Sequence, residues 1–204
     1  NAIYKSVTRE IILVNTKKSI DTREIIKRLG GSIKIAKVFD TCKNIDTKKI
    51  FNILDPQSKK IRFAFSSYTE QINKRNINNY LKEIKYIARE KDIRVNYIIP
   101  KENNALSSAQ VFHKIMPGGY EILIAKYEGK YILAKTEAVQ DVNVFSKLDY
   151  GIPYSQKRAG MLPPKLAQMM INLSLSEGKS MRIYDPFCGT GRIIIEALYM
   201  GLND

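Results

Sequence analysis

The chain has 204 residues, with 34 lysines and arginines against 20 aspartates and glutamates, so its formal net charge is +14. A hydrophobic fraction of 44% is enough for a packed core and excludes wholesale disorder. Two cysteines and one histidine exclude a disulfide framework and a zinc site built from Cys and His ligands alone. The sequence holds no apolar run long enough to span a bilayer and opens with no signal peptide, so we expect a reduced, cytoplasmic protein without membrane or metal partners.

The positive charge lies almost wholly in the first half of the chain. Residues 1–101 hold 23 basic and 10 acidic side chains, a balance of +13, whereas residues 102–204 hold 11 and 10, a balance of +1. A composition rich in Lys, Ile and Asn is also what an AT-rich genome gives any protein, but that drift should act evenly along a chain. The asymmetry favours a phosphate-binding surface in the first half over charges that are merely solvated.

Hydrophobic periodicity predicts short alternating strands and helices in the first half of the chain. The expected order over the first 66 residues is strand, helix, strand, helix, strand, which is typical of a small ferredoxin-like α/β unit. These elements are expected at residues 10–14, 21–29, 32–39, 46–54 and 60–65. An amphipathic helix, a strand, a short helix and a hairpin should follow, at residues 76–91, 93–99, 107–114 and 120–136.

The periodicity fades between residues 141 and 160, which are rich in turn formers and predict a linker between domains. Beyond it, Pro163 and Pro164 should open a helix, because proline is acceptable in a first helical turn. A strand is then expected over residues 181–185 and a helix over residues 192–200.

The most informative stretch is Asp185-Pro186-Phe187-Cys188-Gly189-Thr190-Gly191, between that strand and that helix. An acidic residue after a strand, followed by a Gly-x-Gly turn and a helix, places a ligand against the helix N-terminus at the carboxyl edge of a parallel sheet. The two glycines let the backbone turn sharply and approach the ligand closely. A dinucleotide fingerprint would need a third glycine where Ile194 stands, and a phosphate loop would need Gly-Lys-Ser/Thr. Asp185 would also repel a pyrophosphate, and it suits a ligand with a positively charged amino group.

This heptapeptide resembles motif I of the class I S-adenosylmethionine-dependent methyltransferases, in the form used by RNA guanosine-N2 methyltransferases. The stretch at residues 160–173, Gly-Met-Leu-Pro-Pro-Lys-Leu-Ala-Gln-Met-Met-Ile-Asn-Leu, is similar to the segment that precedes motif I in the THUMP-containing tRNA guanosine-N2 methyltransferases. Residues 139–141 are similar to the join between THUMP and catalytic domains there, although Leu148 precedes Asp149 where that family has an arginine. The resemblance is specific over residues 137–201 and only architectural before them.

The resemblance implies an α/β protein whose N-terminal half is α+β. Its parts would be a ferredoxin-like unit at residues 1–66, a THUMP-like RNA-binding domain at 67–140, a linker at 141–160 and the beginning of a Rossmann-like methyltransferase domain at 161–204. It also implies S-adenosyl-L-methionine as the cofactor and RNA, above all tRNA, as the partner. The cofactor-binding residues would come from motif I and from the helix that flanks the cofactor cleft: Asp185, Pro186, Phe187, Cys188, Gly189, Thr190, Gly191, Pro163, Lys165 and Ala167.

The catalytic Asp/Asn-Pro-Pro-Tyr/Phe motif of that family does not occur in this sequence, whose only Pro-Pro pair lies between Leu162 and Lys165. We therefore expect no catalytic residue in these 204 residues, and we expect the motif to lie beyond Asp204 in a longer protein. Two other interpretations stay open. One is an rRNA or DNA base-amino methyltransferase, which would share motif I, and the other is a non-catalytic RNA-binding module.

Several residues that could carry chemistry have plainer interpretations. Cys188 is more simply a small loop thiol than a nucleophile, and His113 has no partner motif for metal or base chemistry. Glu196 is as well explained by the dipole of its helix as by a contact with substrate. Tyr150 and Tyr154 could stack on bases or anchor a hinge.

Overall fold

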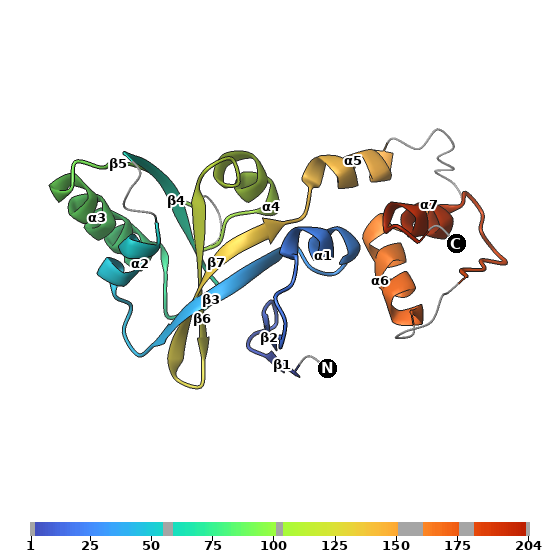
Figure 1. Ribbon diagram of the computed structural model, residues 1–204, viewed down its shortest axis with the longest axis horizontal. Coiled ribbons are helices and arrows are strands. Elements are labelled where there is room, and N and C mark those ends of the chain that lie inside the picture. Colours follow the sequence, from blue (N-terminus) through green and yellow to red (C-terminus); the bar gives the residue numbers. More distant parts are fainter. Residues whose placement is uncertain (1–2, 55–58, 101–103, 151–160, 176–181, 203–204) are drawn as a thin grey trace. The chain divides into compact units, whose positions relative to one another are not determined.

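The computed structural model describes residues 3–54, 59–100, 104–150, 161–175 and 182–202 (Figure 1). The chain divides into two compact units. Unit 1 comprises residues 1–20 and 36–137, and unit 2 comprises residues 21–35 and 138–204. Each unit is therefore built from segments that are distant in the sequence.

Unit 1 contains most of a five-stranded mixed sheet with the strand order β3-β7-β6-β4-β5. Strand β4 pairs in parallel with both β5 and β6, and β6 pairs antiparallel with β7. The strands are β3 (Lys34–Cys42), β4 (Lys60–Ser67), β5 (Arg94–Ile98), β6 (Tyr120–Tyr127) and β7 (Lys130–Val139). A separate antiparallel pair is formed by β1 (Ile3–Ser6) and β2 (Ile12–Asn15).

The turn between β6 and β7 explains why this hairpin could be predicted from the sequence. Glu128 and Gly129, its two central residues, have φ angles of 48° and 75°. Two consecutive left-handed residues match the twist of the flanking strands, and glycine adopts that conformation without strain.

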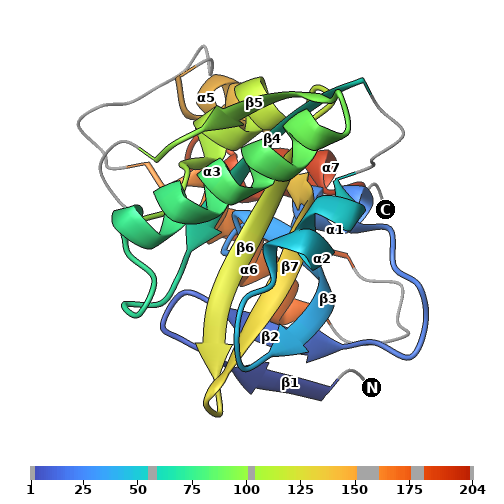
Figure 2. The ribbon, with the colours of Figure 1, turned by 90° about the vertical axis from the view of Figure 1, so that its left-hand side faces the viewer.

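Helices cover both faces of this sheet. The helices α2 (Thr47–Ile53) and α3 (Lys74–Glu90) cover one face, in front of the sheet in Figure 2. The other face is covered by α4 (Ser108–Gln110) and its continuation, the π-helical turn η1 (Val111–Ile115). Side chains alternate along β4 accordingly: Phe63 and Phe65 point into the α2–α3 core, whereas the Arg62 guanidinium reaches the Lys114 carbonyl at 3.2 Å.

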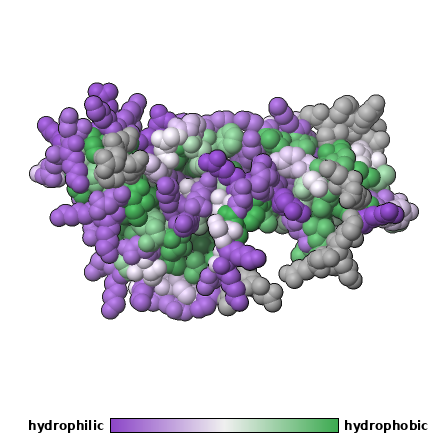
Figure 3. Space-filling view, viewed as in Figure 1, coloured by the Kyte–Doolittle hydropathy of each residue, from purple (hydrophilic) through white to green (hydrophobic). Residues whose placement is uncertain are grey.

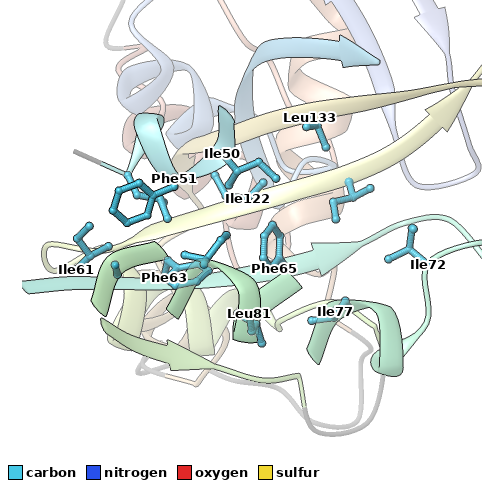
Figure 4. Close-up of a cluster of buried hydrophobic side chains, with 14 residues drawn as sticks. Ile50, Phe51, Ile61, Phe63, Phe65, Ile72, Ile77, Leu81, Ile122 and Leu133 are labelled. Atoms are coloured by element: carbon cyan, nitrogen blue, oxygen red, sulfur yellow. The ribbon is translucent and has the colours of Figure 1, made fainter. Parts of the chain in front are cut away.

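The main core lies between the sheet and the pair α2–α3 (Figure 4). Helix α3 is amphipathic, and four of its residues at three- and four-residue spacing are fully buried: Ile77, Leu81, Ile84 and Ala88. They pack with aromatic and aliphatic residues from β4, β6 and α2. The helix begins at a capping box in which Asn73 and Asn76 satisfy each other's backbone N–H groups.

Unit 2 is mainly helical. Its helices are α1 (Thr22–Arg28), α5 (Val142–Tyr150), α6 (Pro164–Ser174) and α7 (Arg192–Tyr199). Helix α6 packs against α7 through a small apolar cluster of Ile171, Ala197 and Met200. Among the helices that the structure describes, none is long and apolar enough to cross a membrane.

Most of the expected elements are confirmed to within a few residues, and the structure differs from the expected local structure in two places. Residues 142–150, the first half of the predicted linker, form α5, and residues 151–160 lie outside the described residues. Residues 182–185 of the predicted strand are not a strand, because no described strand lies beside them to complete a ladder of hydrogen bonds.

The sheet also bears on the expected ferredoxin-like and THUMP-like parts. The expected boundary after residue 66 falls at the end of β4, and β4 pairs with strands from beyond that boundary. Residues assigned to both parts therefore share one sheet. The division into domains stays a prediction.

Replacing Ile84 with alanine should destabilise unit 1 by about 2–5 kcal/mol, because it removes fully buried methylene groups and leaves a cavity under α3. Urea denaturation followed by circular dichroism measures the free energy of unfolding. The control is Lys85→Ala, an exposed neighbour in the same helix, which should change that free energy by less than about 0.5 kcal/mol. Equal effects of the two variants would contradict the described packing of α3.

Candidate cofactor-binding loop

The loop at residues 185–191 is a tight double turn that leads directly into α7. The Asp185 carboxylate accepts a hydrogen bond from the Phe187 N–H at 3.1 Å, and the Gly191 N–H donates to the Cys188 carbonyl at 2.7 Å. Gly191 then begins the helix, because its carbonyl accepts the first helical hydrogen bond, from the Ile195 N–H at 2.9 Å. The acidic residue and the helix N-terminus are thus joined by a short, internally hydrogen-bonded backbone.

Both glycines of the loop have left-handed backbones, with φ angles of 52° at Gly189 and 74° at Gly191. Residues with a Cβ atom rarely adopt this conformation, so the turn requires glycine at both positions. There is open space where the Cβ atoms of these two residues would lie. A Cβ atom at Gly191 would meet nothing within 4 Å, and one at Gly189 would meet only the Phe187 carbonyl oxygen at 3.8 Å.

The loop is open to solvent. The side chains of Phe187 and Tyr184 are 92% and 87% exposed, and Cys188 is also exposed. Asp185 and Thr190 are half-buried. Within the described part of the chain, only one oxygen of the Asp185 carboxylate accepts a hydrogen bond, which leaves the other oxygen for a ligand.

The residues present fit the methionine end of S-adenosylmethionine. A half-buried carboxylate can bind an ammonium group by a charge-assisted hydrogen bond. The N-terminus of α7 has no side-chain cap, so its first N–H groups are suited to an anionic group such as a carboxylate. The bare glycine backbone between these two elements lets a ligand approach closely.

The structure places the three residues predicted to flank the cofactor, at the start of α6 and just before it, in three different environments. Pro163 is exposed and precedes the helix, and Lys165 is exposed with its ammonium 5.3 Å from the centre of the Phe145 ring. Ala167 is fully buried. A buried methyl group lets neighbouring elements pack closely, so of the three only Pro163 and Lys165 offer exposed surface to a ligand.

A buried polar network that the sequence analysis did not foresee joins α6 to α7. The Gln168 amide Nε2 donates to one oxygen of the Glu196 carboxylate at 2.9 Å, and Arg192 Nη1 lies 3.4 Å from the other. The same Arg192 nitrogen donates to the Leu148 carbonyl of α5 at 2.7 Å. All three side chains are at least 95% buried. Arg192 directly follows the loop, so this network anchors the first turn of α7 and Glu196 has a structural role.

Other candidate residues from the sequence belong to other elements than the loop. His113 is exposed in η1, where its ring packs edge-on against Phe112, and Tyr150 is 87% exposed at the end of α5. Tyr154 lies outside the described residues. The described residues contain no group of three or more His, Cys, Asp or Glu side chains that could hold a metal ion.

The end of α1 packs against α6 at a point where only glycine fits. A Cβ atom on Gly30 would lie 2.1 Å from the Lys165 carbonyl oxygen and 3.0 Å from Gln168 Cβ. Two hydrogen bonds fix the same segment: Asn172 Nδ2 donates to the Arg28 carbonyl at 2.6 Å, and Gln140 Nε2 donates to the Leu29 carbonyl at 3.3 Å. Gly30, just beyond the end of α1, therefore permits a close approach to α6.

Gly30→Ala should destabilise unit 2 by about 1–3 kcal/mol, because the new Cβ atom meets backbone that can move only if α1 and α6 separate. Thermal unfolding measures the effect. The matched control is Gly31→Ala, whose Cβ atom would meet only the flexible end of Met169 at 3.0 Å. Equal tolerance of both substitutions would contradict the described contact between α1 and α6.

Glu196→Ala should destabilise unit 2 by about 3–5 kcal/mol, because it leaves the buried Arg192 guanidinium without a counter-charge and Gln168 without an acceptor. Urea denaturation is the measurement. The control is Glu24→Ala, which breaks an exposed ion pair with Lys27 in the same unit and should cost at most about 1 kcal/mol. A small effect at Glu196 would show that the network does not hold α6 to α7.

Comparison with known proteins finds two matches in sequence. Residues 155–204 match the model of the UPF0020 family, described as an RMKL-like methyltransferase domain. A curated relative, the tRNA (guanine(10)-N2)-dimethyltransferase of Methanothermobacter thermautotrophicus, is 56% identical over 44 residues, which are 22% of this chain and 13% of that protein. The chain thus spans only a small part of this relative.

Among solved structures, TrmN from Thermus thermophilus matches with a TM-score of 0.44 and 16% identity, over 90% of this chain and 50% of that one. The family match concerns the last quarter of the chain, residues 155–204. The predicted resemblance to the tRNA guanosine-N2 methyltransferases is confirmed, and residues 155–204 of this chain are similar to the UPF0020 methyltransferase domain.

Proposed function

We propose that the protein is an S-adenosylmethionine-dependent RNA methyltransferase that modifies the N2 amino group of guanine in tRNA. In this proposal unit 1 binds the RNA, and the loop at residues 185–191 binds the cofactor. The observation that carries the proposal is this loop, in which a half-buried carboxylate, two left-handed glycines and an uncapped helix N-terminus follow one another within seven residues. The family match over residues 155–204 includes it.

The loop would bind the cofactor by its methionine end. Asp185 would hold the amino group, the amides at the start of α7 would face the carboxylate, and Pro163 and Lys165 would lie along the cleft. When bound, S-adenosylmethionine supplies a methyl group activated by its sulfonium charge. The chain's own residues bind and orient that donor, and the exposed Phe187 and Tyr184 offer apolar surface beside it.

The choice of RNA is supported by the charge of the first half and by the relative's name. A balance of +13 over residues 1–101 suits a phosphate backbone, and such binding weakens as salt is raised. The relative is a tRNA (guanine(10)-N2)-dimethyltransferase, and we extend its substrate class to this protein. A guanine amino group inside a helix is poorly accessible, so the target base is expected to leave the stack before it reacts.

Two alternatives remain distinguishable by experiment. An rRNA or DNA base-amino methyltransferase would use the same cofactor loop on another nucleic acid. A non-catalytic RNA-binding module would lack the Asp/Asn-Pro-Pro-Tyr/Phe motif, which these 204 residues do not contain. Sequencing the reading frame beyond Asp204 decides between enzyme and module, and nucleoside analysis of tRNA from a strain lacking the gene decides the substrate.

Asp185→Ala in the gene product should weaken S-adenosylmethionine binding at least about tenfold, because it removes a charge-assisted hydrogen bond worth more than about 1.4 kcal/mol. Isothermal titration calorimetry measures the affinity. Asp185→Asn is the informative partner, since it keeps an oxygen for the Phe187 N–H but removes the charge. Both variants should lose cofactor affinity while RNA binding stays intact. Unchanged cofactor affinity in Asp185→Ala would overturn the assignment of the loop. If Asp185→Ala loses cofactor affinity and Asp185→Asn keeps it, Asp185 has only a turn-forming role.

A further inference from the structure

A continuous basic stripe runs along the outer face of α3. Its five members follow one another at alternating steps of four and three residues: Arg75, Asn79, Lys82, Tyr86 and Arg89. All five are exposed, and the Tyr86 side chain is 66% exposed. Such spacing keeps residues on one face of a helix, so these side chains form a single row. Figure 3 shows a hydrophilic surface at this end of unit 1.

The stripe is held rigidly in place. Its five positions lie opposite the buried stripe of α3, whose fully buried members fix the rotation of the helix on the sheet. Arg75, Lys82 and Arg89 are seven residues apart, which is nearly two turns, so the three cations are spaced by about 10.5 Å along a row of about 21 Å. A rigid row of this kind presents its charges at fixed positions.

Among the described residues, no acidic side chain forms an ion pair with the cations of the stripe. Within the described part of the chain, the side chains of Arg75, Lys82 and Arg89 take part in no ion pair, and the stripe contains no acidic residue. The acidic residues of α3, Glu83 and Glu90, lie beside the row. Glu83 accepts a hydrogen bond from the Thr47 hydroxyl at 3.0 Å, so it faces α2.

The stability of the helix does not explain this arrangement. The first turn of α3 contains Lys74 and Arg75 and no acidic residue. The positive end of the helix dipole favours acidic side chains there and disfavours cations. The placement of Arg75 therefore opposes helix stability, and it adds its charge to the positive end of the dipole, where an anionic ligand would benefit from both.

We propose that the α3 stripe is a docking surface for A-form duplex RNA. The three cations would contact phosphates, and the Tyr86 phenol would donate a hydrogen bond to a ribose 2′-hydroxyl in the shallow minor groove. Single-stranded RNA is the poorer ligand, because its binding sites use several aromatic side chains to stack successive bases and the stripe offers one. This inference rests on the proposed RNA substrate and adds the surface that holds it.

The test compares two triple variants of the 204-residue chain that lose the same charge. Arg75→Ala/Lys82→Ala/Arg89→Ala removes the cations of the stripe. The control, Lys17→Ala/Lys18→Ala/Lys130→Ala, removes three exposed lysines elsewhere in unit 1. The probes are a fluorescently labelled RNA hairpin with a fully paired stem and a DNA hairpin of the same sequence. Binding is followed by anisotropy between 50 and 300 mM salt, about the range over which phosphate contacts lose their affinity.

The stripe variant should bind the RNA hairpin at least about tenfold more weakly and lose about 2–3 units of its log-log salt slope, one for each phosphate contact removed. The control should change the affinity less than about threefold. Tyr86→Phe should bind DNA as before but lose most of its preference for RNA, because only RNA carries the 2′-hydroxyl. Circular dichroism confirms that all variants, substituted only at exposed positions, keep the fold.

Several outcomes would overturn the proposal, and they are separable from failure of the proposed function. Equal losses in the two triple variants would mean diffuse attraction with no docking surface. An unaffected stripe variant would place the RNA elsewhere on the protein while leaving the assignment of the cofactor loop intact. If the unaltered chain binds neither hairpin, the RNA substrate itself is wrong. A Tyr86→Phe variant with an undiminished RNA preference would remove the minor-groove contact.

Discussion

Strand β4 is the constraint on which the rest of unit 1 depends, because it is buried on both faces and parallel to both neighbours. One face meets the apolar core under α2 and α3. On the other, the Ser66 hydroxyl donates to the fully buried Glu121 carboxylate at 2.5 Å, and Thr136 of β7 donates to the same carboxylate at 2.7 Å. Ser66 in turn accepts the Leu106 N–H at 2.9 Å. A strand fixed on both sides determines where α3, and hence its basic stripe, must lie.

Buried polar groups set the geometry of unit 2 in a comparable way. Its apolar cluster is small, and the Gln168–Glu196–Arg192 network adds directional contacts between α6 and α7. Such a network is specific, because a rotation of either helix would break the buried hydrogen bond from Gln168 to Glu196. Arg192, the first residue of α7, takes part in this network. The loop that precedes the helix therefore ends at a fixed point. The loop can then stay exposed and still present Asp185 and its glycines in a defined arrangement.

Elements could be predicted where a local sequence pattern determines them. They were missed where contacts with distant parts of the chain determine them. Helix α3 was predictable because its buried residues recur at helical spacing, and the β6–β7 hairpin because Gly129 fits a left-handed turn. Helix α5 was missed because its residues sit among turn formers and only Phe145 is buried. The strand expected before the loop depended on ladder partners that a local pattern does not contain.

The candidate site was predicted to a similar extent and for similar reasons. The glycine turn and its acidic residue could be recognised because left-handed backbone limits the residues allowed there. The roles of Gln168 and Arg192 could not, because a buried hydrogen bond between two helices leaves no periodic pattern in the sequence. Ala167 was expected from its place in a family motif to contact the cofactor; the structure shows that it is fully buried, and its role stays a prediction.

The arrangement of the excess positive charge in the first half supports an RNA-binding surface more strongly than its total does. Compositional drift toward lysine would distribute cations over any exposed position. On α3, Arg75, Lys82 and Arg89 recur every seven residues on one face, with arginines at both ends of the row, and the row begins at the helix end where positive charge is least favourable. Arginine is suited to bidentate contact with phosphate, which a drift toward lysine would not select. The same total charge scattered over unit 1 would attract polyanions, whereas a rigid row can also fix the orientation of one.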